Sequence, residues 1–133
     1  MAVLPKNSFL LEAQSLNEFH RSIIFRINSC LDPVQPHFLE INFFDVGQGE
    51  AIFIQTPKRN QILIDGGPDS RISRSLSEVM PFWDRTIDLA ILTHPEKDHL
   101  RGLIEVLKQY RIENILWTGV KRDLSEFREW ESL

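Results

Sequence analysis

The sequence predicts an α+β fold in which helices flank a mixed β-sheet. Short apolar runs rich in β-branched and aromatic residues follow one another closely between residues 37 and 64, as in a meander of strands. Downstream, runs with helical spacing of apolar residues alternate with further strand-like runs. The 133 residues suffice for one domain with a small core. This order of elements is typical of helices laid against a mixed sheet.

The first 36 residues have a different pattern. Five apolar residues recur at spacings of three and four and would line one face of a helix: Leu16, Phe19, Ile23, Ile24 and Ile27. Two prolines between residues 31 and 36 then interrupt regular structure and indicate a linker. We therefore expect an N-terminal amphipathic helix and linker over residues 1–36 and the domain proper over residues 37–133. The helix either packs on the domain, or it is an arm of a longer parent protein or an attachment to a partner.

Three strands are expected between residues 37 and 64. They are the alternating run HFLEINFFDV and the shorter runs EAIFIQT and NQILIDGG. Gly47 and Gly49 separate the first two runs and can adopt positive φ, which predicts a tight turn. Pro57, a turn former, lies between the second and third runs and predicts a hairpin there.

The second half of the chain alternates helices with strands. Three helices are predicted from apolar residues on a common face: Ile72, Leu76 and Val79; Leu100, Leu103, Ile104 and Leu107; and Leu124, Phe127 and Trp130. The run IDLAILT predicts a fully buried strand, and IENILW predicts another strand.

Composition excludes several classes of protein. A formal net charge of -4 argues against a general, strongly basic nucleic-acid binder, although a local basic groove could still serve a nuclease. Cys30 is the single cysteine, so an internal disulfide and a CxxC zinc ribbon are excluded. No apolar stretch approaches the ~20 residues of a transmembrane segment, and the MAVLP start has no signal-peptide core. As a standalone chain the protein is expected to be soluble and cytoplasmic.

Four potential metal ligands lie in the loop after the predicted buried strand that ends at Thr93: His94, Glu96, Asp98 and His99. Loops at the carboxyl ends of buried strands are where α/β sheets hold ligands. In an extended loop His94 and Glu96 would project the same way, whereas Asp98 and His99 would project differently and could serve a second centre. Imidazole and carboxylate suit zinc, manganese or iron. The alternatives are structural histidines and an Asp98 that caps the following helix.

The loop THPEKDH matches the H-x-[HDE]-x-D-H signature of the metallo-β-lactamase superfamily. The segments FFDVGQGEAIFIQTP, ILIDGGP and IDLAILTHP resemble the β-lactamase-like domain of ComEC-type DNA-internalisation competence proteins. The resemblance covers about residues 38 to 120. It implies an αββα-type sandwich of two similar halves, of which this sequence holds only one, so that the fold would be a truncated metallo-β-lactamase fold.

The resemblance also implies roles for single residues. His94 and Glu96 would face a first metal, and Asp98 and His99 a second. Asp98 would in addition orient or deprotonate the attacking water. Asp65 matches a family aspartate that supports the loop by hydrogen bonds rather than by ligation. The implied cofactor is zinc or manganese, although a carboxylate at Glu96, where most of the superfamily has histidine, puts zinc at that position in doubt.

The activity implied by the resemblance is metal-dependent hydrolysis, of a phosphodiester or nuclease-like kind, with DNA as a partner. The alternative is a non-catalytic truncated fragment or a partner-binding half-domain. No histidine follows His99, whereas the family fold takes further ligands from its second half. Half of a sandwich leaves apolar sheet uncovered, which predicts a homodimer or pairing with a missing C-terminal half. As part of a longer competence protein the chain would be membrane-associated.

Overall fold

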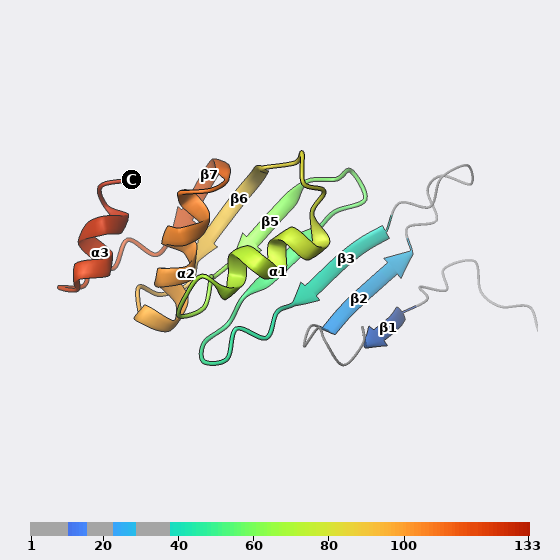
Figure 1. Cartoon of the computed structure of the whole chain (residues 1–133), viewed down its shortest axis with the longest axis horizontal. Coiled ribbons are helices and arrows are strands. Elements are labelled where there is room, and N and C mark those ends of the chain that lie inside the picture. Colours follow the sequence, from blue (N-terminus) through green and yellow to red (C-terminus); the bar gives the residue numbers. More distant parts are fainter. Residues whose placement is uncertain (1–10, 16–22, 29–37) are drawn as a thin grey trace, which may run out of the picture.

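The computed structural model describes residues 11–15, 23–28 and 38–133, and in these it has one mixed sheet and three helices (Figure 1). The seven strands lie in chain order: β1 (Leu11–Ser15), β2 (Ile23–Asn28), β3 (Phe38–Phe43), β4 (Ile52–Gln55), β5 (Gln61–Ile64), β6 (Thr86–Leu92) and β7 (Arg111–Trp117). The helices are α1 (Arg71–Val79), α2 (Lys97–Leu107) and α3 (Ser125–Trp130). Strands β1 to β5 pair antiparallel, and β5 to β7 pair parallel. The predicted α+β class with a mixed sheet is therefore confirmed.

The helix predicted in the N-terminal segment is wrong where the structure describes that segment. Leu11–Ser15 and Ile23–Asn28 are strands, and β2 pairs with β3 over its whole length. The run IIFRIN contains three isoleucines, whose β-branched side chains favour strands, and the edge of β3 supplies the hydrogen-bond partners that stabilise one. Leu16 and Phe19, and the linker predicted over residues 31–36, lie outside the described residues.

The positive φ predicted for Gly47 and Gly49 and the β4–β5 hairpin are confirmed, although residues 44–51 join β3 to β4 in place of a tight turn. Gly47 and Gly49, between β3 and β4, have φ of 85° and 79°, in the region that favours glycine. Strands β4 and β5 form the predicted antiparallel hairpin. Its turn is closed by the backbone N–H of Thr56, which donates to the Asn60 carbonyl at 2.9 Å.

The core lies between the helices and one face of the sheet. Phe53, Leu63 and Ala90 are neighbours across β4, β5 and β6, and all three are buried on that face. The helices contribute their predicted apolar faces, including Ile72 and Leu76 of α1 and Leu100, Leu103 and Ile104 of α2. α1 and α2 pack together and lie over the same face of the sheet, and α3 packs on α2 (Figure 1).

Among the residues that the structure describes, no helix lies on the second face of the sheet, which corrects the expectation that IDLAILT is fully buried. Ala90 and Leu92 of β6 are buried, but Leu89 and Ile91, which point to the other face, are only half-buried. An uninterrupted apolar run in the sequence therefore indicates that both faces of the strand are apolar, but not that both faces are covered by other elements.

Within the described part of the chain, no helix has the length and apolar character that crossing a bilayer requires.

Candidate metal centre

The candidate centre lies where the parallel strands β5 and β6 end side by side. Ile64 at the end of β5 pairs with Ile91 of β6, and the backbone N–H of Asp65 donates to the Ile91 carbonyl at 2.8 Å. Asp65 follows β5 directly, while Thr93 and His94 follow β6. Because parallel strands bring their carboxyl ends to one edge, residues far apart in sequence meet there.

Asp65 is a buried carboxylate whose hydrogen bonds all lie within the centre. Its side chain is 1% exposed, and its backbone has a φ of 56°. The Thr93 backbone N–H donates to Oδ1 at 2.9 Å, and the Thr93 hydroxyl donates to Oδ2 at 2.5 Å. His99 Nδ1 lies 2.9 Å from the same Oδ2. A buried charge requires such partners, and the left-handed backbone is a conformation that aspartate tolerates better than most residues.

The two histidines of the loop lie against each other. His99 is buried in the first turn of α2, whereas His94 is exposed after β6. Their ring centroids are 3.7 Å apart at an interplanar angle of 49°. The ligand atoms offered by Asp65, His94 and His99 all lie within 4.8 Å of one another, so these three residues form a group that could hold a metal ion.

The hydrogen bonds assign the same tautomer to both histidines. An ionised Asp65 only accepts, so His99 Nδ1 must carry a proton and donate it. The Thr93 hydroxyl has one proton, which goes to Asp65, so the contact of 2.9 Å between Thr93 Oγ1 and His94 Nδ1 requires His94 Nδ1 to donate as well. Both rings then present an Nε2 lone pair, the form in which imidazole binds metals.

Glycines let three segments approach the centre closely. A Cβ on Gly49 would lie 1.9 Å from the carbonyl oxygen of Asp98, and one on Gly102 would lie 1.8 Å from the carbonyl oxygen of Gly66. Two backbone hydrogen bonds stabilise these contacts. The Gly66 N–H donates to the His99 carbonyl, and the Gly102 N–H donates to the Gly67 carbonyl, both at 2.9 Å. The start of α2, and with it His99, is thereby held against the loop that carries Asp65.

The remaining predicted ligands take different places. Asp98 lies inside the first turn of α2 and is partly exposed, with Oδ2 4.0 Å from His99 Nε2. It does not cap the helix, because the N-cap position is held by Glu96. The Glu96 side chain is 55% exposed and its Oε1 lies 3.7 Å from Arg122. The structure therefore brings His94 together with His99, and Glu96 lies outside their group.

The shape of the loop explains the position of Glu96. An extended loop would point His94 and Glu96 the same way, but the Glu96 N–H donates to the His94 carbonyl at 2.9 Å and closes a three-residue turn around Pro95. Proline has a φ suited to the centre of such a turn.

Thr93 and Gly102 belong to the centre, although neither is among the site residues predicted from the sequence. Thr93 was assigned only to the end of a strand. Gly102 lies inside a helix, where glycine costs about 1 kcal/mol relative to alanine, and such a glycine usually has a packing reason. The glycine inside a predicted helix was thus the sequence feature that could have identified Gly102 as a packing residue. The sequence held no comparable feature for Thr93.

Charged pairs border the centre. Lys97 at the start of α2 lies 3.3 Å from Glu126 of α3. The pKa of Glu126 is lowered to about 2, first by its own backbone N–H, then by the Ser125 hydroxyl and by Lys97. A hydrogen bond from Arg71 lowers the pKa of Asp69, two residues before α1.

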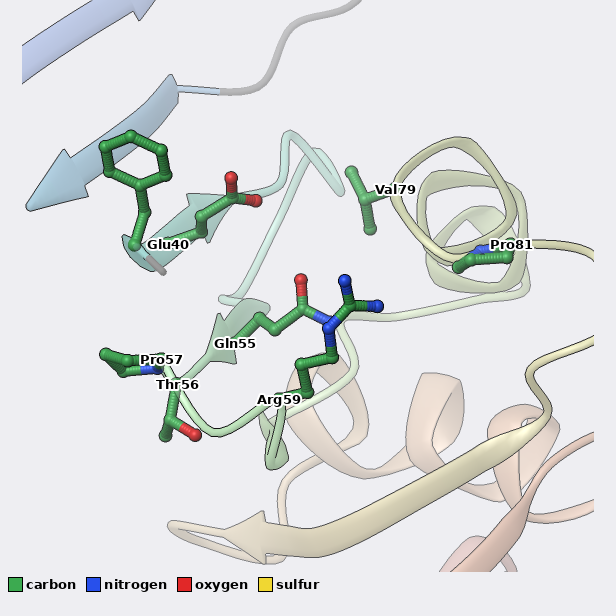
Figure 2. Close-up of a pocket in the computed structure, with 8 residues that line it drawn as sticks. Glu40, Gln55, Thr56, Pro57, Arg59, Val79 and Pro81 are labelled. Atoms are coloured by element: carbon green, nitrogen blue, oxygen red, sulfur yellow. The ribbon is translucent and has the colours of Figure 1, made fainter. Parts of the chain in front are cut away.

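A separate depression of about 240 Å³ lies at the opposite end of β5 (Figure 2). Its lining comes from β3, from β4 and the turn after it, and from the end of α1: Phe38, Glu40, Gln55, Thr56, Pro57, Arg59, Val79 and Pro81. The turn precedes β5, whereas Asp65 follows it. The depression is therefore distinct from the histidine group.

No protein-family model matches the chain. Part of the chain is similar to ComE operon protein 3 of Bacillus subtilis (strain 168), with 31% identity over 58% of this chain. The match covers 12% of that protein, so this chain spans a small part of its relative's length. The distant relation to a ComEC competence protein, which the motifs predicted, is confirmed at this level. Membership of the metallo-β-lactamase superfamily stays a prediction.

Proposed function

We propose that this distant relative of ComE operon protein 3 carries a divalent-metal centre of the hydrolase type at the carboxyl ends of β5 and β6. One observation carries the proposal: His94 and His99 offer ligand atoms within 4.8 Å of each other, and Asp98 Oδ2 lies 4.0 Å from His99 Nε2. The hydrogen bonds from both Nδ1 atoms support it, because they leave both Nε2 atoms free to bind.

His94, His99 and Asp98 are the proposed ligands, and Asp65 is the proposed support. The Asp65 carboxylate accepts three contacts from Thr93 and His99, so its role is to hold a histidine in the ligating tautomer. Asp98 faces the Nε2 side of His99, where a shared ion would sit. Glu96 as a ligand stays a prediction, since its carboxylate would first have to leave Arg122.

The donor chemistry suits zinc or manganese. Two neutral imidazoles and a carboxylate are ligands that both ions accept. When bound, such an ion would supply Lewis-acid activation and lower the pKa of a coordinated water. Asp98 is then the carboxylate available near the ion to orient or deprotonate that water, as the resemblance implies.

The proposed reaction is hydrolysis of a phosphodiester, with DNA as the substrate class, on one half of a metallo-β-lactamase sandwich. Four basic side chains lie in or next to α2: Lys97, Arg101, Lys108 and Arg111. Three of them lie in ion pairs, Lys97 with Glu126, Lys108 with Glu105 and Glu129, and Arg111 with Glu113. We therefore expect a phosphate to be recognised chiefly through the metal and less through a basic groove.

A non-catalytic metal-binding half-domain is the second candidate. A catalytic zinc normally has three protein ligands and an open position, and the third proposed ligand, Asp98, is not part of the compact group of Asp65, His94 and His99. Under this candidate the chain binds a metal without turning over a substrate.

Calorimetric titration of the purified chain with Zn²⁺ and Mn²⁺ tests the proposal. We expect one tight site that His94→Ala and His99→Ala each abolish and that Glu96→Gln leaves within about threefold. Loss of binding only in Glu96→Gln would overturn the ligand set, and no binding heat at neutral pH would overturn the centre itself. Hydrolysis of bis-p-nitrophenyl phosphate by the loaded protein, with His99→Ala as the background, then separates the enzyme from the non-catalytic candidate.

A further inference from the structure

Arg71, the first residue of α1, is an oriented cation beside the candidate centre. Its Nε–H is shared between both oxygens of Asp69, at 3.0 and 3.1 Å, and its backbone N–H donates to Asp69 Oδ1 at 2.9 Å. These charge-assisted contacts converge on one carboxylate and fix the direction of the guanidinium. Among the residues that the structure describes, no acceptor meets its Nη1 or Nη2.

Gly47 provides the space that the guanidinium occupies. A Cβ on Gly47 would lie 2.6 Å from Nη1 and 2.9 Å from Nη2 of Arg71, so any other residue at this position would displace the guanidinium. The φ of 85° favours glycine here for a second, independent reason. The two nitrogens that have no acceptor therefore lie directly against residues 46–50, the glycine loop.

The glycine loop connects Arg71 to the candidate centre (Figure 1). Gly49 packs on the carbonyl oxygen of Asp98, and the loop also accepts a hydrogen bond from the Gly67 N–H at 3.1 Å. Gly47 and Gly49 are two residues apart, so the Arg71 guanidinium lies on the order of 10 Å from Asp98 at the start of α2. Arg71 thus lies on the rim of the centre and not among its proposed ligands.

The glycine loop also presents backbone donors. The N–H groups of Gln48, Gly49 and Glu50 meet no acceptor in the described part of the chain, whereas the Gly47 N–H donates to Asp45 Oδ1 at 3.0 Å. Neighbouring N–H groups in a backbone that alternates the sign of φ can form a concave anion-binding site. The loop and the guanidinium beside it are therefore both hydrogen-bond donors.

The charges near the loop favour an anion once a metal is bound. Arg101 lies one turn after Asp98 on α2, and its charge contributes to the lowered pKa of Asp69. Asp45 in turn interacts with the charge of Arg71. Two arginines thus balance two carboxylates, and the divalent ion of the proposed centre would more than offset Asp98.

We propose that Arg71 and the N–H groups of the glycine loop bind a phosphate that neighbours the scissile phosphate in a polynucleotide. The inference rests on the proposed function, in which the metal holds the scissile phosphate. Guanidinium and backbone N–H groups are common donors to phosphates of nucleic acids. Phosphates follow one another at ~3.4 Å of rise along a stacked strand, so a strand on the metal brings one of its next phosphates to the rim. The site therefore favours a chain of nucleotides over a diester with a single phosphate.

Two arginines of α1 provide a matched pair of variants. Arg71→Met removes the proposed contact. Arg74→Met removes the same charge one turn further along the helix, where Arg74 pairs with Glu78 and its side chain is 81% exposed. The probe is a labelled, phosphorothioate-linked oligothymidylate, which resists hydrolysis. Its binding to the zinc-loaded whole chain is followed by fluorescence anisotropy over a series of salt concentrations, and circular dichroism verifies that each variant is folded.

Arg71→Met should weaken binding about tenfold or more and make the slope of log K against log salt shallower by about 0.7, the value for one phosphate of a single strand. Arg74→Met should leave the affinity within about threefold and the slope unchanged. Equal losses in the two variants would overturn the proposal, because the effect would then be one of net charge. Wild-type binding by Arg71→Met, or no binding by the wild-type chain, would also overturn it.

A chelator separates this phosphate site from the metal centre. If the wild-type chain still binds the oligothymidylate in chelator and Arg71→Met abolishes that binding, the phosphate site stands even if the chain hydrolyses nothing. If the wild-type chain binds zinc and hydrolyses bis-p-nitrophenyl phosphate, while Arg71→Met binds the oligothymidylate as tightly as the wild type does, the proposed function stands and the phosphate site alone is overturned.

Discussion

His99 Nδ1 lies 2.9 Å from Asp65 Oδ2, although 34 positions separate the two residues in the chain. The pair joins the loop after β5 to the first turn of α2 at a buried position, with side chains 8% and 1% exposed. In such surroundings an unpaired charge is costly, so each partner needs the other. The same bond also sets the tautomer of His99, so packing and metal chemistry depend on one carboxylate.

Asp65→Asn should lower both stability and metal affinity. Asparagine tolerates the left-handed backbone at this position, so the substitution removes the charge with little strain. We expect a loss of about 1–3 kcal/mol in unfolding free energy by denaturant titration and a 10- to 100-fold loss of metal affinity by calorimetry. Asp65→Ala should lower the unfolding free energy by about 1–2 kcal/mol more than Asp65→Asn, because alanine tolerates the left-handed backbone less well. Unchanged metal affinity in Asp65→Asn would show that Asp65 has no role in metal binding.

Thr93→Val tests the hydroxyl that lies between Asp65 and His94. Valine keeps the shape of threonine but can neither donate to Asp65 nor accept from His94. We expect metal affinity to fall about tenfold, with a thermal melt shifted by only a few degrees. Thr86→Val, at a half-buried threonine at the start of β6, the strand that Thr93 follows, is the control and should leave metal binding unchanged. A similar loss in both variants would point to a general effect on β6.

Gly49→Ala should be far more destabilising than Gly119→Ala. Both glycines have positive φ, 79° and 75°, so both substitutions carry a backbone cost of about 1 kcal/mol. A Cβ on Gly49 would also strike the Asp98 carbonyl oxygen at 1.9 Å, whereas one on Gly119 would meet nothing within 4 Å. The difference in unfolding free energy should exceed about 2 kcal/mol, and equal values would mean that the turn does not pack on α2.

The contribution of Glu126 to the stability of the native state should disappear in acid. Its pKa falls from 4.5 to about 2 on folding, so the carboxylate stabilises the native state above pH 4.5, and that stabilisation is lost as the pH falls towards 2. Glu126→Gln should therefore lower the midpoint of thermal unfolding at pH 7 and have little effect near pH 2. Lys97→Met removes only one, weaker partner of Glu126. It should therefore lower the midpoint of thermal unfolding at pH 7 by less than Glu126→Gln does.

Most of the fold could be predicted because the elements after residue 37 have clear periodicity. The alternation in HFLEINFFDV and the face formed by Ile72 and Leu76 required no tertiary information. The N-terminal prediction failed because IIFRIN fits both a helical face and a strand. Only the unsatisfied edge of β3, a tertiary partner, decides between the two.

The candidate centre was predicted in location but not in detail. The position of four donors after a buried strand pointed to the edge of the sheet at which Asp65, His94 and His99 come together. The turn around Pro95, which separates Glu96 from His94, depends on a single backbone hydrogen bond that residue types do not disclose. The contact between His94 and His99 depends on how α2 leaves the loop, which Gly102 and Gly66 determine through packing.

The parallel pairing of β5 with β6 has a consequence for how the protein acquires its centre. The hairpins from β3 to β5 can close early because they join neighbouring segments, but Asp65 meets Thr93 and His99 only after the chain has passed through α1 and returned. The donors are thus brought together by a long-range step of folding. Substitutions that destabilise α1 should therefore weaken metal binding, although α1 itself contributes no proposed ligand.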